Sequence, residues 1–341
     1  MTDPMTDLRQ TATDLVAPGK GILAADESTG TIKKRFDLIQ VSSTEENRRS
    51  YRELLFSTPG LGEHIRGVIL YDETIRQSAE DGTPFVEVLE KAGVIPGIKV
   101  DTGAKPLAKF PGETVTEGLD GLRERLVAYR ELGARFAKWR ATVFIGAELP
   151  TPGAIDANAH AMARYAALCQ EAGIVPIVEP EILMDGTHDL DACASATAAT
   201  LRALYRELDA ARVELPGSLL KVNMIVPGAA SPNQVDDDTV AVATIRCLTA
   251  NVPADVPGIV FLSGGMSDAE ATSRLDRMNR TGGSPWQLSF SYGRALQAAS
   301  LAAWSGDPAN VNAAQTALAH RAKMNGLARD GRYDSSMEAA V

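Results

Sequence analysis

The chain has 341 residues, of which 45% are hydrophobic and 23% charged, so it can bury a large core and is not intrinsically disordered. Its formal net charge is −10, and no long basic run interrupts this acidic balance, which excludes wholesale binding to nucleic acid or to an anionic membrane surface. An anionic substrate would need a local cluster of lysine and arginine.

The N-terminal segment, residues 1–16, lacks the basic and apolar stretches of a secretory signal, and no apolar run is long enough to span a bilayer. The three cysteines, Cys169, Cys193 and Cys247, are isolated and odd in number, which is typical of packing residues in a reducing compartment. The four histidines show no metal-ligand spacing, so a histidine-rich metal site is disfavoured, and the sequence predicts no cofactor. We therefore expect a cytoplasmic globular protein.

Short apolar runs alternate with helix-like stretches along the whole chain. The runs cover residues 21–26, 67–72, 95–101, 135–143, 175–183, 219–226, 258–265 and 286–293. Apolar residues at helical spacing predict a helix within 118–133, closed by a glycine. Capping-box spacing marks helix starts at Ser43 with Glu46 and at Ser267 with Glu270.

This strand–helix alternation predicts an α/β protein whose parallel sheet closes into a (β/α)₈ TIM barrel. A doubly wound open sheet is the alternative, and the lack of G-x-G-x-x-G after the first run disfavours its dinucleotide-binding form. We expect residues 1–20 to be an N-terminal extension, 21–327 to be one catalytic barrel domain, and 328–341 to be a polar, mobile C-terminal tail.

Charged residues stand at several predicted strand positions. They are Asp26, Lys138, Glu179, Glu181 and Lys221. Any one of them alone is most simply a solvated strand end or a structural ion pair. The carboxyl ends of barrel strands meet at one face, however, and a core built only for stability would carry Val, Ile and Leu there. Their convergence therefore favours an active site.

Lys221 lies in the middle of the apolar run LLKVNMIV, where an ammonium is costly unless it is paired or loses its proton. Desolvation and a second cation, Lys138, both favour the neutral amine, which can attack a carbonyl carbon and form a Schiff base. Glu179 is the candidate acid/base of intermediate pKa, and Glu181 shares its face of the strand. For this acidic pair, a metal site and a counter-ion role are the alternatives.

The last two predicted strands end in loops suited to phosphate. They supply Ser263, Gly264, Gly265, Ser291, Gly293 and Arg294. Glycine N–H groups, a helix N-terminus and a guanidinium group all bind phosphate oxygens. A single Gly-Gly pair is ordinarily only a turn, but two such loops after strands seven and eight favour a phosphate site.

A second anionic group could meet Ser28, Thr31 and Arg35 after the first strand. A helix cap followed by a solvated basic face explains the same residues equally well. Arg140 shares the face of Lys138 and is a further candidate for substrate binding. A structural ion pair is the alternative for Arg140.

Taken together, the chain resembles class I fructose-1,6-bisphosphate aldolases over nearly its whole length. The matching segments, in family order and at family-like spacing, are GKGILAADESTG, TEENRRSYRELL, GIKVD, FAKWR, VPIVEPEILMDGTHD, LLKVNM, FLSGGMS and SFSYGRALQ. The resemblance implies a (β/α)₈ lyase of glycolysis and gluconeogenesis that reversibly cleaves fructose 1,6-bisphosphate into dihydroxyacetone phosphate and glyceraldehyde 3-phosphate. It also implies a homotetramer whose partner is a small phosphosugar.

The same resemblance implies a role for each matching site residue. Lys221 would form the Schiff base, and Glu179, with Glu181 beside it, would serve carbinolamine formation and dehydration. Asp26 would take the C4 hydroxyl proton, and Lys138 would assist electrostatically. Ser28 and Thr31 would lie toward the C6 phosphate, and the C1 phosphate would be held by Ser263, Gly264, Gly265, Ser291, Gly293 and Arg294, with Arg35 nearby.

The chain departs from this pattern at two places. Thr102 replaces a lysine that faces the distal phosphate in animal and plant relatives, with Lys105 as a possible substitute. Those relatives end in a tyrosine that helps to protonate the enamine, whereas the last tyrosine here is Tyr333. Thr102 keeps open a preference for fructose 1-phosphate or sedoheptulose 1,7-bisphosphate. The remaining alternatives are a non-catalytic scaffold barrel, disfavoured by the buried lysines, and a metal-dependent aldolase, disfavoured by the histidine count.

Overall fold

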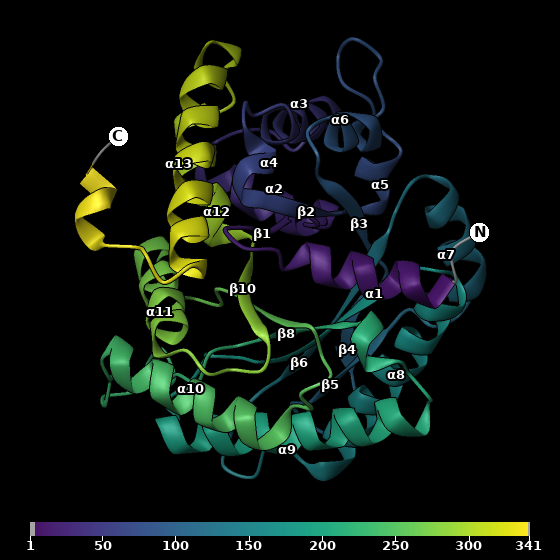
Figure 1. Ribbon diagram of the computed structural model, residues 1–341, viewed down its shortest axis with the longest axis vertical. Coiled ribbons are helices and arrows are strands. Elements are labelled where there is room, and N and C mark those ends of the chain that lie inside the picture. Colours follow the sequence, from purple (N-terminus) through teal and green to yellow (C-terminus); the bar gives the residue numbers. More distant parts are fainter. Residues whose placement is uncertain (1–3, 340–341) are drawn as a thin grey trace.

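Each of the eight predicted apolar runs matches one strand of a closed parallel barrel in the computed structural model, which describes residues 4–339 (Figure 1). The strands are β1 (Gly21–Ala24), β2 (Ile65–Leu70), β3 (Ile95–Lys99), β6 (Phe136–Val143), β7 (Val175–Ile182), β8 (Leu219–Val222), β9 (Gly258–Phe261) and β10 (Gln287–Tyr292). They are hydrogen-bonded in the order β1–β10–β9–β8–β7–β6–β3–β2, which closes on itself. The predicted (β/α)₈ barrel is therefore confirmed.

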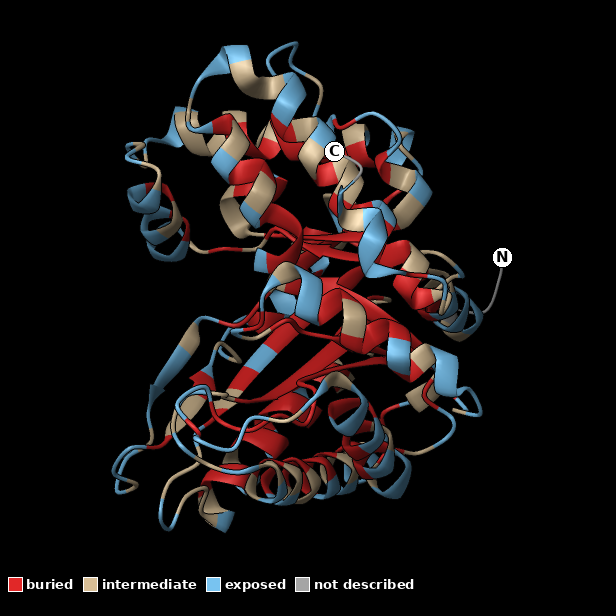
Figure 2. Ribbon diagram, turned by 90° about the vertical axis from the view of Figure 1, so that its left-hand side faces the viewer, coloured by how far each residue is buried: buried red, intermediate tan, exposed pale blue. Residues whose placement is uncertain are grey.

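Helices surround the barrel and turn their buried faces toward it (Figure 2). They are α1 (Pro4–Leu15), α2 (Thr29–Leu38), α3 (Glu45–Phe56), α4 (Leu61–His64), α5 (Asp72–Ile75), α6 (Phe85–Lys91), α7 (Leu122–Glu131), α8 (Pro152–Glu171), α9 (Leu190–Ala210), α10 (Asp237–Asn251), α11 (Asp268–Thr281), α12 (Arg294–Trp304) and α13 (Val311–Arg329), with short 3₁₀ turns at Leu215–Gly217, Pro308–Asn310 and Ser335–Ala339. Within residues 4–339, no helix combines the length and apolar character needed to cross a membrane.

The helix starts test the capping signals one by one. Ser267 begins α11 with a complete capping box, because its side chain accepts the Glu270 N–H while the Glu270 carboxylate accepts the Ser267 N–H. The prediction for Ser43 is wrong by one residue: Thr44 caps α3 by accepting the N–H of Asn47. The helix predicted within 118–133 is confirmed as the shorter α7.

The amino ends of the strands are closed by a dry apolar plug. Helix α1 lies across this end, and the side chains of Leu8 and Leu15 are buried against the first inward-facing residues of the strands. Among those residues, Phe136 fills the barrel axis because its neighbour Gly97 has no side chain. A Cβ on Gly97 would lie 2.3 Å from the Phe136 ring. The described part of the predicted extension, residues 4–20, thus covers the barrel floor, and residues 1–3 lie outside the described chain.

The C-terminal segment runs from α13 back along α11 (Figure 1). Tyr333 is buried there; its N–H donates to Asp276 Oδ1 at 2.9 Å and its hydroxyl donates to Glu338 Oε1 at 2.8 Å. The mobility expected for residues 328–341 stays a prediction, and residues 340–341 of that segment lie outside the described chain.

An antiparallel hairpin that was not predicted from the sequence follows β3. It consists of β4 (Gly103–Pro106) and β5 (Thr114–Glu117). Both strands are short and largely polar, so neither shows the apolar run that marks a barrel strand.

Candidate active site

A cavity of about 280 Å³ lies at the carboxyl ends of the strands, where barrel folds place their active sites. Every predicted site residue except Gly265 lines it, which brings together residues from the strand ends and the loops that follow them: Asp26, Ser28, Thr31, Arg35, Lys138, Arg140, Glu179, Glu181, Lys221, Ser263, Gly264, Ser291, Gly293 and Arg294. Tyr333, Thr102 and Lys105 are not among the residues that line it.

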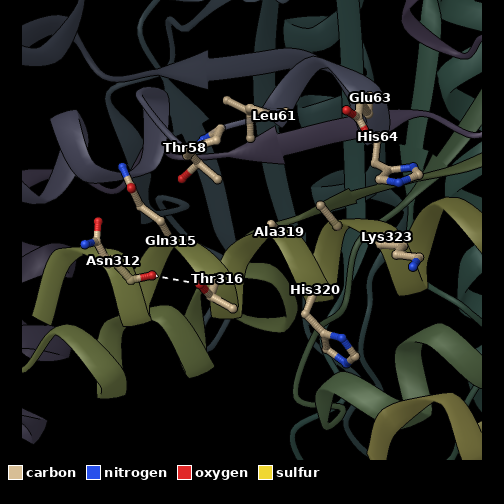
Figure 3. A pocket seen from close by; sticks show the side chains of 13 residues that line it. Thr58, Leu61, Glu63, His64, Asn312, Gln315, Thr316, Ala319, His320 and Lys323 are labelled. Carbon is tan, nitrogen blue, oxygen red and sulfur yellow. Dashed lines mark hydrogen bonds between the residues drawn. The ribbon is translucent and has the colours of Figure 1, made fainter. Parts of the chain in front are cut away.

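A larger cavity, of about 730 Å³, lies between α13 and the segment around α4 (Figure 3). Its walls carry polar side chains such as Asn312 and Thr316 opposite Thr58 and Leu61. It contains none of the ion-paired lysines and carboxylates of the smaller cavity. The convergence of buried charges therefore identifies the smaller cavity as the candidate active site.

Four charged groups form an alternating chain at the bottom of this cavity. The Lys138 Nζ lies 2.7 Å from Asp26 Oδ2 and 3.2 Å from Glu179 Oε2, and the Lys221 Nζ lies 3.0 Å from Glu179 Oε1. The strands β6, β7 and β8 supply one residue each, and Asp26 follows β1. The side chains of Lys138, Glu179 and Lys221 are each at most 5% exposed. Each charge is thus held by an opposite one rather than by solvent.

The electrostatics of three of these groups, Asp26, Lys138 and Glu179, favour their ionised forms. Burial by itself raises the pKa of Asp26, but Lys138 and Lys221 outweigh it and hold that pKa well below its ordinary value. Burial lowers the pKa of Lys138, yet Asp26 and Glu179 raise it well above the ordinary lysine range. Burial also raises the pKa of Glu179, but Lys138, Lys221 and Arg140 bring it below the ordinary glutamate value. The intermediate pKa expected for Glu179 is therefore not found in the ligand-free site, because three cations surround it.

Two further charged residues line or support the cavity, and sequence reasoning missed both. Lys99, at the end of β3, lines the cavity, and its Nζ lies 2.9 Å from Asp101 Oδ1. The other carboxylate oxygen of Asp101 accepts the backbone N–H of Arg140 at 3.2 Å. The signal was present, because Lys99 and Asp101 show the same two-residue spacing that marked Glu179 and Glu181.

Arg140 forms the structural ion pair that was its alternative interpretation, and its part in substrate binding stays a prediction. Its guanidinium forms an ion pair with Glu181, and both side chains line the cavity. Burial lowers the pKa of Arg140, but Glu181 raises it further, so the guanidinium is a permanent cation at the rim. Within residues 4–339, no group of three or more histidine, cysteine, aspartate or glutamate side chains is arranged to hold a metal ion.

Glu27 is the centre of a buried network that sequence reasoning also missed. Its carboxylate pairs with Arg35 and, at 2.6 Å, with Arg52, and it accepts the Gln297 amide at 3.0 Å. Burial raises the pKa of Glu27, but Arg35 and Arg52 lower it below its ordinary value. Since Arg35 lines the cavity and Glu27 follows Asp26 directly, this network fixes one arginine of the site.

Helix α2 combines both interpretations given to its first residues. Ser28 is its N-cap residue, and the Ser28 and Thr31 hydroxyl oxygens lie 3.2 Å apart at the cavity wall. The solvated basic face exists as well, because Lys33 pairs with Asp37 on the exposed side. One face of α2 is therefore solvated and the other is available to a ligand.

The two predicted phosphate loops follow β9 and β10 and meet at the adjoining wall, since β10 pairs with β1 in the barrel. Ser291 is buried there and, among the described residues, its hydroxyl has no hydrogen-bond partner, which leaves it free to bind a ligand. Gly293 caps α12, and the guanidinium of Arg294 donates to the carbonyl of Gly264. The expected placement of Gly265 needs correction: its N–H donates to Met184 Sδ at 2.8 Å, and it does not line the cavity. Its part in phosphate binding stays a prediction.

The fold and the site define a class of protein, a (β/α)₈ enzyme with a buried lysine–carboxylate network beside loops that suit phosphate. Comparison with known sequences narrows this class, since residues 7–341 match the family model described as fructose-bisphosphate aldolase class-I. The chain belongs to the class-I fructose-bisphosphate aldolase family, and it is a lyase.

Individual relatives agree with this assignment. A probable fructose-bisphosphate aldolase class 1 of Xanthomonas campestris is 55% identical over 327 residues, which cover 96% of this chain and 98% of that one. The cytosolic fructose-bisphosphate aldolase 4 of Arabidopsis thaliana is 54% identical over 93% of this chain and 81% of its own. The solved structure of the Plasmodium falciparum aldolase, in complex with TRAP and a small-molecule inhibitor, superposes with a TM-score of 0.97 at 47% identity, covering 98% and 97% of the two chains.

Proposed function

We propose that the chain catalyses the reversible aldol cleavage of fructose 1,6-bisphosphate through a Schiff base on Lys221. The observation that carries this proposal is the position of the Lys221 Nζ, which lines the cavity at 3.0 Å from Glu179 and has Lys138 and Asp26 beside it. An amine next to a proton-transfer group can condense with a ketone. Lys138 also lies beside carboxylates, but Asp26 and Glu179 raise its pKa, so it stays charged and is the weaker candidate for the nucleophile.

Schiff-base formation needs two proton transfers at the same place. The neutral Lys221 amine adds to the ketose carbonyl to give a carbinolamine, and protonation of its hydroxyl lets water leave as the iminium ion forms. Glu179 lies within hydrogen-bond reach of the Lys221 nitrogen and is the group that moves these protons. When Lys221 gives up its charge, Glu179 loses one of the cations that depress its pKa, so its pKa rises toward the value needed for proton donation.

Carbon–carbon cleavage follows from the charge of the iminium ion. Asp26, kept ionised by its low pKa, takes the proton of the C4 hydroxyl as the C3–C4 bond breaks. The bonding electrons pass to the iminium and form an enamine, and the aldehyde departs. Lys138 lies between Asp26 and Glu179 and holds both carboxylates in place. Protonation of the enamine and hydrolysis of the imine release dihydroxyacetone phosphate.

The phosphates have separate binding regions in this proposal. The C1 phosphate lies at Ser263, Gly264, Ser291, Gly293 and Arg294, and the C6 phosphate lies toward Ser28 and Thr31. Lys99 supplies a cation at the cavity where Thr102 cannot, which favours a bisphosphate over fructose 1-phosphate. We expect Lys99→Met to lower kcat/KM for fructose 1,6-bisphosphate more than for fructose 1-phosphate. Equal losses with both substrates would contradict this placement.

Borohydride trapping tests the covalent step. Reduction in the presence of dihydroxyacetone phosphate should attach the triose to Lys221, as located by peptide mass, and Lys221→Ala should show no adduct. Lys105→Ala, which removes an exposed lysine outside the cavity, is the matched control and should be trapped like the wild type. An adduct on Lys138 would contradict the assignment, and loss of activity in excess chelator would favour a metal-dependent reaction instead.

We further propose that the enzyme works in the cytoplasm as a homotetramer. The cysteines Cys169, Cys193 and Cys247 are unpaired and buried, in agreement with a reducing compartment. The tetramer rests on the family resemblance. Cell fractionation and light scattering of the purified protein test the two statements separately, and a mass other than four subunits would contradict the second.

A further inference from the structure

The peptide group between Gly264 and Gly265 is held from both sides. Its carbonyl accepts from the guanidinium of Arg294, and its N–H donates to the sulfur of Met184 at 2.8 Å. Gly264 and Arg294 line the active-site cavity, whereas Gly265 and Met184 do not. The carbonyl therefore faces the phosphate side of the turn, and the N–H faces the opposite side, toward the loop that follows β7.

This orientation is the less favourable one for an anion. A phosphate is attracted by N–H groups and guanidinium and repelled by the negative end of a carbonyl dipole. The Gly264 carbonyl instead accepts a hydrogen bond from Arg294, and the Gly265 N–H donates to Met184. Reversal of this one peptide group would aim the N–H into the cavity and release the guanidinium, so both donors would become available together.

The turn is built so that such a reversal is easy. It spans residues 263–266 and is closed by a hydrogen bond from the Met266 N–H to the Ser263 carbonyl at 3.0 Å, which does not involve the central peptide. Rotation of the central peptide interconverts turn types, and glycine at both central positions removes the steric penalty. Gly264 already has a left-handed backbone, with φ of 50°.

Met184 is packed directly against this turn. A Cβ added to Gly265 would lie 2.9 Å from the Met184 sulfur, and one added to Gly264 would lie 3.3 Å from it. The two glycines thus allow the thioether to reach the backbone. A thioether is only a weak hydrogen-bond acceptor, so a phosphate oxygen, which is charged, can replace it.

We infer that Met184 is a positioning residue that holds the phosphate turn with the Gly265 N–H turned away from the cavity and thereby sets the affinity for the sugar phosphate. The inference rests on the proposed function only in placing a phosphate at this turn. Binding reverses the 264–265 peptide, exchanges the Met184 sulfur for a phosphate oxygen at the Gly265 N–H, and frees Arg294. The weakness of the sulfur contact keeps the competing state low in stability, so that substrate binds and product leaves.

Two substitutions of similar volume change only the acceptor. Met184→Leu removes it, and Met184→Gln replaces it with a stronger amide oxygen. The dissociation constant for inorganic phosphate, measured by calorimetry, should fall about two- to fivefold in Met184→Leu and rise about two- to fivefold in Met184→Gln, the range of one modest hydrogen bond. KM for fructose 1,6-bisphosphate should follow the same order, with kcat unchanged.

Controls separate the possible failures. Arg294→Ala should weaken phosphate binding at least tenfold; an unchanged value would show that phosphate binds elsewhere, which overturns the inference and the proposed C1 site but not the Schiff base. If Arg294→Ala weakens binding while Leu and Gln at position 184 do not differ in opposite directions, the inference alone is overturned. Should either variant fail to fold, wild-type crystals with phosphate decide: a Gly265 N–H still bonded to Met184 overturns the inference.

Discussion

The two ends of the barrel use the same strands but opposite kinds of side chain. Along β6 the inward residues are Phe136, then Lys138, while along β7 Ile177 is followed by Glu179. At the amino ends these residues form a dry plug under α1, and at the carboxyl ends they form an ion-paired network around a cavity. Two residues along a strand therefore separate a stabilising layer from a chemical one, and the two can be perturbed independently.

The largest effect is expected at the carboxyl end. Lys221→Met replaces the amine with a side chain of similar length and should lower kcat/KM by roughly three orders of magnitude or more, because the covalent route is lost. The free energy of unfolding should change little, since Glu179 keeps Lys138 as a partner. Activity assays and urea unfolding check both halves of this prediction. A large loss of stability with retained activity would contradict the assignment of chemistry to the carboxyl end and of stability to the amino end.

Phe136→Ala breaks the opposite end. The ring fills the axis between Gly97 and Gly67, so its removal leaves a cavity and should destabilise the protein by about 3–5 kcal/mol. At a temperature where the variant stays folded, kcat should remain within about twofold of wild type. A kcat that falls with the stability would show that the floor and the active site are coupled. Denaturant unfolding and steady-state kinetics measure the two quantities.

The dependence of stability on pH tests the same comparison, because Asp26 and Glu179 lie at the carboxyl ends of the strands, whereas the plug at the amino ends is built from apolar side chains. The pKa of Asp26 and that of Glu179 are lower in the folded protein than in the unfolded chain, so near pH 4 the unfolded chain binds the extra protons and stability falls as pH falls. Asp26→Asn should remove part of this dependence, so that it loses about 1 kcal/mol less than wild type between pH 6 and pH 3. Unfolding curves at several pH values test this; parallel pH profiles would contradict it.

The smallest effect concerns helix starts on the outside of the barrel. Ser267→Ala removes the hydroxyl that accepts the Glu270 N–H and donates to the Glu270 carboxylate, and it should cost about 1 kcal/mol although the Ser267 N–H still donates to Glu270. Ser43→Ala is the matched control, because Thr44 caps α3, and it should change stability by less than about 0.5 kcal/mol. Thermal unfolding of the two variants measures the difference, and equal losses would mean that Ser43 contributes to the cap.

The sequence was sufficient for the barrel because each strand is buried on both faces and so reads as an apolar run. The hairpin β4–β5 was not predicted because its strands are short and polar. Lys99 and Asp101 were not predicted as site residues although their two-residue spacing was visible, since a charge at a strand end is usually solvated. The surroundings of Glu27 and Gly265 could not be predicted from the sequence. Their partners, Arg52 and Met184, come from distant parts of the chain, and no local sequence pattern indicates these contacts.

The position of α1 has a consequence for synthesis on the ribosome. This helix is made first, yet the residues that bury Leu8, Ala12 and Leu15 include Leu219 and Val260, and Arg329 donates to the carbonyl of Val16. The contacts between α1 and the base of the barrel therefore cannot be complete until nearly the whole chain has left the ribosome. The leucines of α1 therefore stay without these partners during most of translation. The packing of α1 against the base of the barrel is a late step of folding that depends on long-range contacts.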